Sequence, residues 1–184
     1  GVSVEEGGDM EFTPDITVRD GELIEGSNWS VECVYTPGHT SNHMCFQDKA
    51  EKALFTGDHV MGWSTSIISP PDGDMQAYME SLVKLLTRDD AIYWPTHGPS
   101  ITEPKAHVQA FIEHRRQRET QIFNCIDENI FVIADMVPVM YRDTPEFMYP
   151  AAARSVLAAV EYMVARGELL TSGAINLESE YHRA

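Results

Sequence analysis

The sequence predicts an α+β fold, with strands in its first third and helices in its last. Short apolar runs separated by glycine-containing turns continue to about residue 66. Apolar residues at 3.6-residue spacing begin near residue 74 and dominate beyond about residue 103. We therefore predict a sheet-containing unit over residues 1–103, a connecting helix over 104–122 and a small helical unit over 123–184.

The first elements are predicted as strands. Runs at 15–18, 21–24 and 29–34 are separated by Asp20-Gly21 and by Gly26-Ser27-Asn28. Glycine and asparagine accept the backbone conformations of tight turns, so this spacing predicts a hairpin or meander.

Helices follow, each with a recognisable start or stop. Asp74 suits the N-cap of a helix that carries apolar residues on one face, and Thr102 with Pro104 suits the start of the next. Two more helical stretches are predicted over 127–140 and 151–166, the second ending at Gly167. Beyond it, runs at 169–171 and 174–177 predict a small hairpin.

Three short motifs carry the chemistry of the chain. Each places a metal-capable side chain beside a glycine, at the point where an apolar run ends. The motifs are Thr36-Pro37-Gly38-His39-Thr40, Phe55-Thr56-Gly57-Asp58 and Pro95-Thr96-His97-Gly98. We expect His39, Asp58 and His97 to lie at the tips of buried strands, where sheet proteins build active sites.

The order and context of these motifs resemble the second half of the metallo-β-lactamase-fold hydrolases. The resemblance implies an αββα sandwich, of which this chain holds the C-terminal half, and a site for two zinc ions. It also implies that His39 binds one ion, that Asp58 bridges both and is central to catalysis, and that His97 binds the second. Ser69-Pro70-Pro71-Asp72-Gly73-Asp74, and the segment from His114 to Glu119, resemble the branch with a winged-helix-like C-terminal domain.

The main metal-binding motif of that family, H-x-H-x-D-H, occurs nowhere in these 184 residues, and only 38 residues precede His39. We interpret the sequence as part of a longer hydrolase, whether truncated naturally, cut by a protease or trimmed. Each ion would have two protein ligands from His39, Asp58 and His97, whereas a catalytic zinc ion has three. We therefore expect weak or absent zinc binding and incomplete activity in this chain alone.

The remaining histidines and acidic residues are predicted to serve structure. His43 follows His39 by four residues, but Pro37 and Gly38 favour a loop there, so we expect His43 to support the ligands rather than bind metal. His59 would face away from Asp58 in an extended segment, as a packed or exposed imidazole. The other histidines lack ligand spacing, and a turn and a helix cap account for the acidic pair; these residues are His107, His114, His182, Asp72 and Asp74.

Composition narrows the class of protein. The net charge is −16 and the pI is about 4.6, and no apolar run approaches the roughly 20 residues that span a bilayer. Gly1 to Asp9 lack the basic and apolar regions of a signal peptide. Cys33, Cys45 and Cys125 match no zinc ligand set, so we expect buried, reduced thiols in a cytoplasmic protein.

Charge disfavours nucleic acid as a partner, although some members of the resembling branch are single-strand nucleases. Residues 123–184 contain four basic and nine acidic side chains, a net charge of −5. Arg115, Arg116 and Arg118 form the one basic cluster, which we interpret as a solvated helix face or an ion-pair network with Glu113 and Glu119.

Two functions of different classes remain open. The first is a portion of a dinuclear zinc hydrolase that acts on a small-molecule ester, thioester, lactone or phosphodiester. The alternative is a non-catalytic half-domain that serves assembly. In both cases half a sandwich leaves an exposed apolar sheet, so we expect self-association through it, with the N-terminal strands or the Asp74 helix at the contact.

Overall fold

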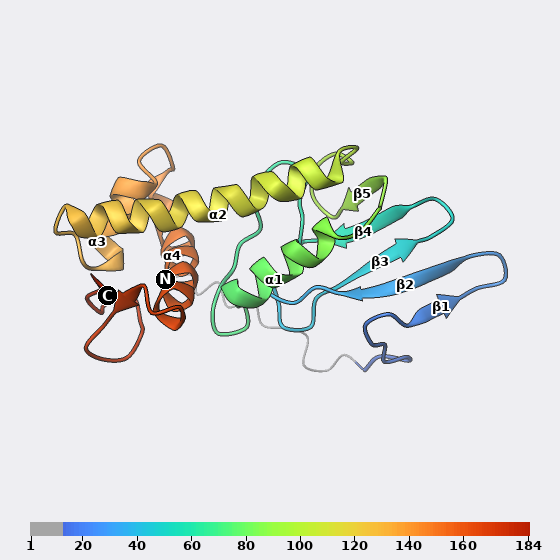
Figure 1. Ribbon diagram of the computed structural model, residues 1–184, viewed down its shortest axis with the longest axis horizontal. Coiled ribbons are helices and arrows are strands. Elements are labelled where there is room, and N and C mark those ends of the chain that lie inside the picture. Colours follow the sequence, from blue (N-terminus) through green and yellow to red (C-terminus); the bar gives the residue numbers. More distant parts are fainter. Residues whose placement is uncertain (1–12) are drawn as a thin grey trace.

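A computed structural model describes residues 13–184 and confirms the α+β class, with a five-stranded sheet followed by a helical region (Figure 1). The predictions made for Gly1 to Asp9 lie outside the described residues. Among the residues described, none of the helices combines the length and apolarity needed to cross a bilayer. Cys33, Cys45 and Cys125 are free and buried, as expected.

The strands of the main sheet follow each other in chain order. They are β1 (Leu23–Glu25), β2 (Ser30–Tyr35), β3 (Met44–Asp48), β4 (Ala53–Gly57) and β5 (Ile92–Pro95). Neighbours from β1 to β4 are antiparallel, whereas β5 lies parallel to β4. Because β2 and β4 both run opposite to β3, the C-terminal ends of β2, β4 and β5 meet at one edge of the sheet.

The strand predicted over residues 15–18 is wrong. That segment has no ladder partner in the sheet, and Ile16 is exposed, so the run has no apolar face to bury. The run predicted at 21–24 forms β1 from Leu23, and the run at 29–34 forms β2 with a shift of one residue.

Helix α1 (Met75–Leu86) begins where the sequence predicts, because the Asp74 side chain accepts a hydrogen bond from the Ala77 amide at 2.7 Å. It connects β4 to β5 and packs its apolar face, which includes Tyr78 and Leu82, against the sheet. Figure 1 shows α1 lying across one face of the strands.

Helix α2 (Pro104–Asp127) runs to Asp127, five residues beyond the predicted connecting helix. Pro104 occupies its first turn, but Glu103 rather than Thr102 is the N-cap, without a side-chain hydrogen bond. The next helix, α3 (Ile133–Met140), therefore begins later than the predicted residue 127. A short 3-10 turn (Glu146–Met148) leads into α4 (Tyr149–Ala165), and Gly167 follows with a φ of 72°.

The predicted C-terminal hairpin has a different second strand. β6 (Leu169–Leu170) pairs with β7 (His182–Arg183), not with residues 174–177. The intervening loop closes on Tyr181, whose buried hydroxyl donates to the Asn176 carbonyl at 2.6 Å and accepts from the Asn176 amide at 2.9 Å. This anchor holds residues 174–177 in the loop instead of the sheet.

Two apolar cores share α2. The first contains the inner face of the sheet, α1 and the first half of α2, including Phe111 and Ile112. The second contains the end of α2, including Ile122 and Ile126, with α3, α4 and β6. Phe111 and Ile112 belong to the first core, which also takes in Ala158 of α4, and α2 is long enough to bridge both cores (Figure 1).

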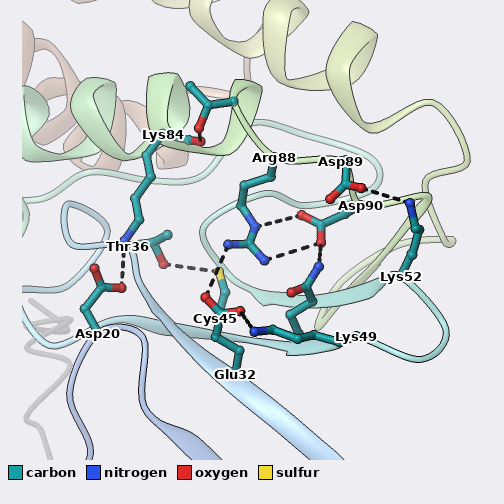
Figure 2. Close-up of polar contacts among 12 residues, drawn as sticks. Asp20, Glu32, Thr36, Cys45, Lys49, Lys52, Lys84, Arg88, Asp89 and Asp90 are labelled. Atoms are coloured by element: carbon teal, nitrogen blue, oxygen red, sulfur yellow. Dashed lines mark hydrogen bonds and ion pairs between the residues drawn. The ribbon is translucent and has the colours of Figure 1, made fainter.

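A polar network joins the far ends of the strands, opposite the edge where β2, β4 and β5 end. Asp90 is buried at the start of β5 and accepts hydrogen bonds from the Arg88 guanidinium at 2.9 Å and from the Gln47 amide (Figure 2). Surface pairs surround it, among them Lys52 with Asp89 at 2.8 Å. This network fixes the connection between α1 and β5.

Candidate metal centre

The three predicted ligands converge at the edge of the sheet where β2, β4 and β5 end. His39 Nε2 lies 4.0 Å from Asp58 Oδ2, and His97 Nε2 lies 3.5 Å from Asp58 Oδ1. One carboxylate therefore stands between two imidazole nitrogens. Two imidazoles and a carboxylate are donors that zinc accepts.

The loop that carries His39 rests on α1. Gly38 has a φ of 133°, and a side chain at this position would meet the Tyr78 backbone at 2.3 Å. The Asp74 amide donates to the Gly38 carbonyl at 2.9 Å, and the Ser81 hydroxyl donates to the Pro37 carbonyl at 2.9 Å. Glycine is required because only it fits both the backbone conformation and the close contact with the helix.

A hydrogen bond fixes the tautomer of His39. Its Nδ1 lies 2.6 Å from the carbonyl oxygen of Ile67. A carbonyl accepts and does not donate, so Nδ1 carries a proton, and Nε2 is the nitrogen that faces Asp58 and would bind an ion. Metal-binding histidines in proteins are commonly oriented by such a bond.

His43 lies behind these ligands. Its Nδ1 contacts the Thr36 hydroxyl at 2.9 Å, and its ring lies so close to Gly57 that a side chain there would meet Nε2 at 2.7 Å. Burial, reinforced by the neighbouring His39, lowers the pKa of His43 to about 4 despite the opposing influence of Asp58. The ring is therefore neutral near pH 7.

His59 is a packed imidazole, one of the two alternatives expected, although no extended strand turns it away from the site. The chain turns after Gly57, which also has a positive φ of 53°, so the extended geometry on which that expectation rested is absent. The His59 ring is fully buried, with its centroid 4.7 Å from that of Tyr78 and 5.5 Å from that of His43. Burial holds the pKa of His59 well below its usual value.

The donors fit a zinc site in kind but fall short in number. Asp58 Oδ1 is buried and has no hydrogen-bond partner among the described residues, which is the condition of an atom that awaits a ligand. Across residues 13–184, however, no group of three or more metal-binding side chains is close enough to hold an ion. His39 with Asp58 and Asp58 with His97 form two pairs.

The interpretation of the arginine cluster is wrong for Arg115. This side chain is only 6% exposed, donates to the Ser66 carbonyl and lies 5.1 Å over the Tyr78 ring. Only Arg116 is exposed, and Arg118 lies 4.2 Å over the Tyr141 ring. Arg115 lies on a polar face of α2. This face is buried because α2 packs there against α1, α4 and the segment after β4.

Ser66, Tyr78 and Arg115 are features of the site that the sequence did not reveal. Their partners lie far away in the chain: 49 residues separate Arg115 from Ser66, and 19 separate Tyr78 from His59. The apolar spacing of α1 identified Tyr78 as a core residue, but no pattern indicated that its hydroxyl would face the metal-binding segment.

Two large apolar side chains flank the donors. Trp63 is 73% exposed, and its ring stacks on His97 with centroids 6.3 Å apart and an interplanar angle of 7°. Ile67, whose carbonyl holds His39, also exposes its side chain. The opening of the site is therefore partly apolar.

Comparison with known families identifies the class. Residues 3–97 match the metallo-beta-lactamase superfamily, and residues 133–171 match the beta-lactamase associated winged helix domain. The chain belongs to the metallo-beta-lactamase superfamily. Within that superfamily it carries the winged-helix domain that the sequence led us to expect.

Curated relatives are longer proteins. A beta-lactamase-like protein 2 homolog from Drosophila melanogaster is 36% identical over 84% of this chain and 51% of its own length. An atrochrysone carboxyl ACP thioesterase from Aspergillus fumigatus is 37% identical over 57% of this chain and 32% of its own length. The chain thus spans about half or less of the curated relatives it matches.

Solved structures agree on the fold. A beta-lactamase domain protein from Burkholderia ambifaria has a TM-score of 0.80 at 20% identity, covering 95% of this chain and 54% of that chain. A metallo-beta-lactamase family protein from Thermus thermophilus has a TM-score of 0.79 at 18% identity, covering 94% and 55%. Both likenesses extend through the sheet and the helical region.

Proposed function

We propose that this chain forms part of a dinuclear metal hydrolase whose natural substrate contains an ester or thioester carbonyl. The observation that carries the proposal is the placement of Asp58 between His39 and His97, with a buried Oδ1 that lies 3.5 Å from His97 Nε2 but makes no hydrogen bond among the described residues. A structural aspartate would be expected to have its buried oxygen hydrogen-bonded.

Three residues of the chain would be the metal ligands in this proposal. Asp58 offers one carboxylate oxygen toward each histidine, so it would be a ligand shared with both of them. His39 and His97 each offer an imidazole Nε2 toward a different oxygen of that carboxylate. When bound, zinc or a similar divalent ion acidifies water and polarises the carbonyl that is attacked.

The substrate class rests on two kinds of support. Relatives from two fungi are named atrochrysone carboxyl ACP thioesterases, at 37% and 34% identity. Trp63 and Ile67 place apolar surface beside the donors, which suits the acyl part of an ester or thioester better than a phosphodiester. Lactones contain the same carbonyl chemistry and remain in this class.

The rival proposal is a non-catalytic unit for assembly, and one observation favours it. No third donor accompanies either histidine–aspartate pair among the described residues. Two protein ligands leave most of an ion's coordination to water, so affinity is expected to be low.

Zinc content and hydrolysis separate the two proposals. The 184-residue chain and a version extended at its N-terminus by a segment containing H-x-H-x-D-H are loaded with zinc, dialysed and assayed with nitrophenyl esters and acyl thioesters. We expect retained zinc and turnover only in the extended version, with both lost on Asp58→Ala. Asp89→Ala, an exposed change at the opposite edge of the sheet, is the matched control.

Two results would contradict the proposals. Stoichiometric zinc and turnover in the 184-residue chain would show that a further ligand completes the site, with His43 and His59 the first residues to test. An extended version that retains no zinc would reject the hydrolase and leave the assembly role.

A further inference from the structure

One segment contacts all three proposed ligands. Residues 58–68, which we name the ligand loop, begin with Asp58. The Ile67 carbonyl accepts the hydrogen bond from His39, and the Gly62 amide donates to the His97 carbonyl at 2.8 Å. The position of this loop therefore sets the distances within the site.

The long helix α2 holds the ligand loop at two points. His107 Nε2 lies 2.9 Å from the carbonyl oxygen of Met61, and the Arg115 guanidinium donates to the carbonyl of Ser66. The two residues are eight positions apart, which is about 12 Å along the helix axis. A loop fixed near both ends to a rigid helix has little freedom to shift.

The contact at Ser66 continues to the backbone of Asp58. The Ser66 hydroxyl lies 2.5 Å from the Asp58 carbonyl oxygen and 2.9 Å from that of His59. From α1, the Tyr78 hydroxyl donates to the same His59 carbonyl at 2.9 Å, and Arg115 lies over the Tyr78 ring. Arg115 thus supports Asp58 through Ser66 and through Tyr78.

The surroundings of Arg115 indicate that it orients the ligand loop and does not stabilise the fold. Its side chain is nearly fully buried. Among residues 13–184, its Nε has no hydrogen-bond partner and no carboxylate forms an ion pair with it. Burial of an unpaired cation is costly, and an apolar residue would pack at this interface with less penalty.

We infer that Arg115, assisted by His107, is a positioning residue that fixes the ligand loop. Through these contacts α2 would connect the position of the metal ligands to the second apolar core, in the C-terminal helical region. The end of α2 supports this connection, since Ile122 and Ile126 are buried in that core. The inference rests on the proposed function for the assignment of His39, Asp58 and His97 as metal ligands. The contacts between α2 and the ligand loop do not depend on that assignment.

The test uses the 184-residue chain with Arg115→Met, Arg115→Lys and the matched control Arg116→Met, which changes an exposed arginine one position along the same helix. Amide hydrogen exchange reports on the loop through Gly62 and on the sheet through β3. We expect Arg115→Met to raise exchange at Gly62 about tenfold or more relative to β3, because the loop opens locally. Arg115→Lys should give a smaller rise, and Arg116→Met none.

A cobalt titration of the same variants in the N-terminally extended version, followed by visible absorbance, gives a second readout. The dissociation constant for Co²⁺ should rise about tenfold in Arg115→Met, since loss of the contacts that orient metal ligands typically weakens metal binding by about 10-fold to 100-fold. It should not change in Arg116→Met. His39→Ala is the reference for loss of a ligand.

The outcomes separate the inference from the proposed function. Equal exchange at Gly62 in Arg115→Met and Arg116→Met overturns the inference, whatever the metal data. Absence of Co²⁺ binding in the extended version counts against the metal site, while the exchange data still decide the role of Arg115. If Arg115→Met does not fold, His107→Leu and Tyr78→Phe each remove one hydrogen bond to the loop and carry the same expectation at Gly62.

Discussion

Two buried polar clusters lie at opposite ends of one sheet and differ in how fully their atoms are paired. In the cluster around Asp90, the carboxylate accepts from both Arg88 and Gln47 (Figure 2). In the cluster around Asp58, buried atoms of Asp58, His59 and Arg115 have no partner among the described residues. A further such atom belongs to His114, on α2 beside Arg115.

The difference teaches how to distinguish structural from functional polarity in this protein. A network that only stabilises the fold is selected for complete pairing, because each orphaned buried group costs stability. A site that binds a ligand keeps open acceptors and donors for it, at the expense of stability. Substitutions at the two ends of the sheet should therefore have different effects on stability.

Asp90→Ala should have the largest effect on stability. It leaves the buried Gln47 amide without its acceptor and the partly buried Arg88 guanidinium with Glu32 alone, at 3.9 Å. Loss of one partner from a buried ion pair costs about 3 to 5 kcal/mol, which is the upper bound here. Urea unfolding measures the change. Asp89→Ala, one position earlier, removes an exposed partner of Lys52 and should leave the midpoint unchanged. Similar urea midpoints for Asp90→Ala and Asp89→Ala would contradict the view that the Asp90 cluster stabilises the fold.

The second prediction compares the two faces of the sheet. The inner face is covered by α1, whereas Phe46, Phe55 and Trp94 are cross-strand neighbours on the outer face, with Phe55 48% and Trp94 47% exposed. We predict self-association through the outer face at micromolar concentration.

Sedimentation velocity tests this prediction. Because burial of one large apolar side chain contributes about 1.5 to 3 kcal/mol, Trp94→Lys should weaken association about tenfold or more. Val83→Lys, at an exposed apolar position on α1, tests the alternative contact through the Asp74 helix and should have no effect if the outer face of the sheet is the interface. A monodisperse monomer for the unchanged chain would contradict the prediction.

Asp58→Asn should behave in the opposite way to Asp90→Ala. Without added metal, we expect the free energy of unfolding to stay the same or to rise by up to about 1 kcal/mol, since a buried unpaired carboxylate oxygen is replaced by a neutral amide. Thermal unfolding with and without millimolar Zn²⁺ should show that the variant loses any stabilisation by the ion. His182→Gln is the control for histidines outside the site. A loss of several kcal/mol would mean that Asp58 is structural.

The smallest effect concerns His114. Burial, reinforced by the neighbouring Arg115 and Arg118, lowers the pKa of this ring to about 4. The unfolded chain takes up a proton near pH 6.5, whereas the folded chain does so only near pH 4. Stability from the neutral ring is therefore present above pH 6.5 and is lost as the pH falls toward 4.

Between about pH 7 and 4.5, the free energy of unfolding should decrease by about 1 kcal/mol less in His114→Gln than in the unchanged chain. This value allows for solvent screening of a half-buried ring. Urea unfolding at about pH 7, 5.5 and 4.5 measures it, since these values span the window between the two pKa values. An unchanged slope of stability against pH would show that His114 is not one of the groups responsible.

Short stretches of sequence determined a large part of the fold and the identity of the donors. Asp74 caps α1 as predicted, because a cap is a contact between residues three positions apart. His39, Asp58 and His97 were identified by the glycine turns that follow apolar runs, and the direction of β2, β4 and β5 then brings them together. The family resemblance assigned them to metal.

Only the tertiary structure decided which polar residues support that site. Arg115 looks like its exposed neighbour Arg116 in the sequence, yet it is buried because α2 packs against the ligand loop and α1. The partner of β6 was likewise settled by the burial of Tyr181, not by the local run at 174–177. Caps, turns and apolar periodicity are local and can be read in a few residues, whereas burial of a charge and pairing of a short strand depend on surfaces brought together from distant parts of the chain.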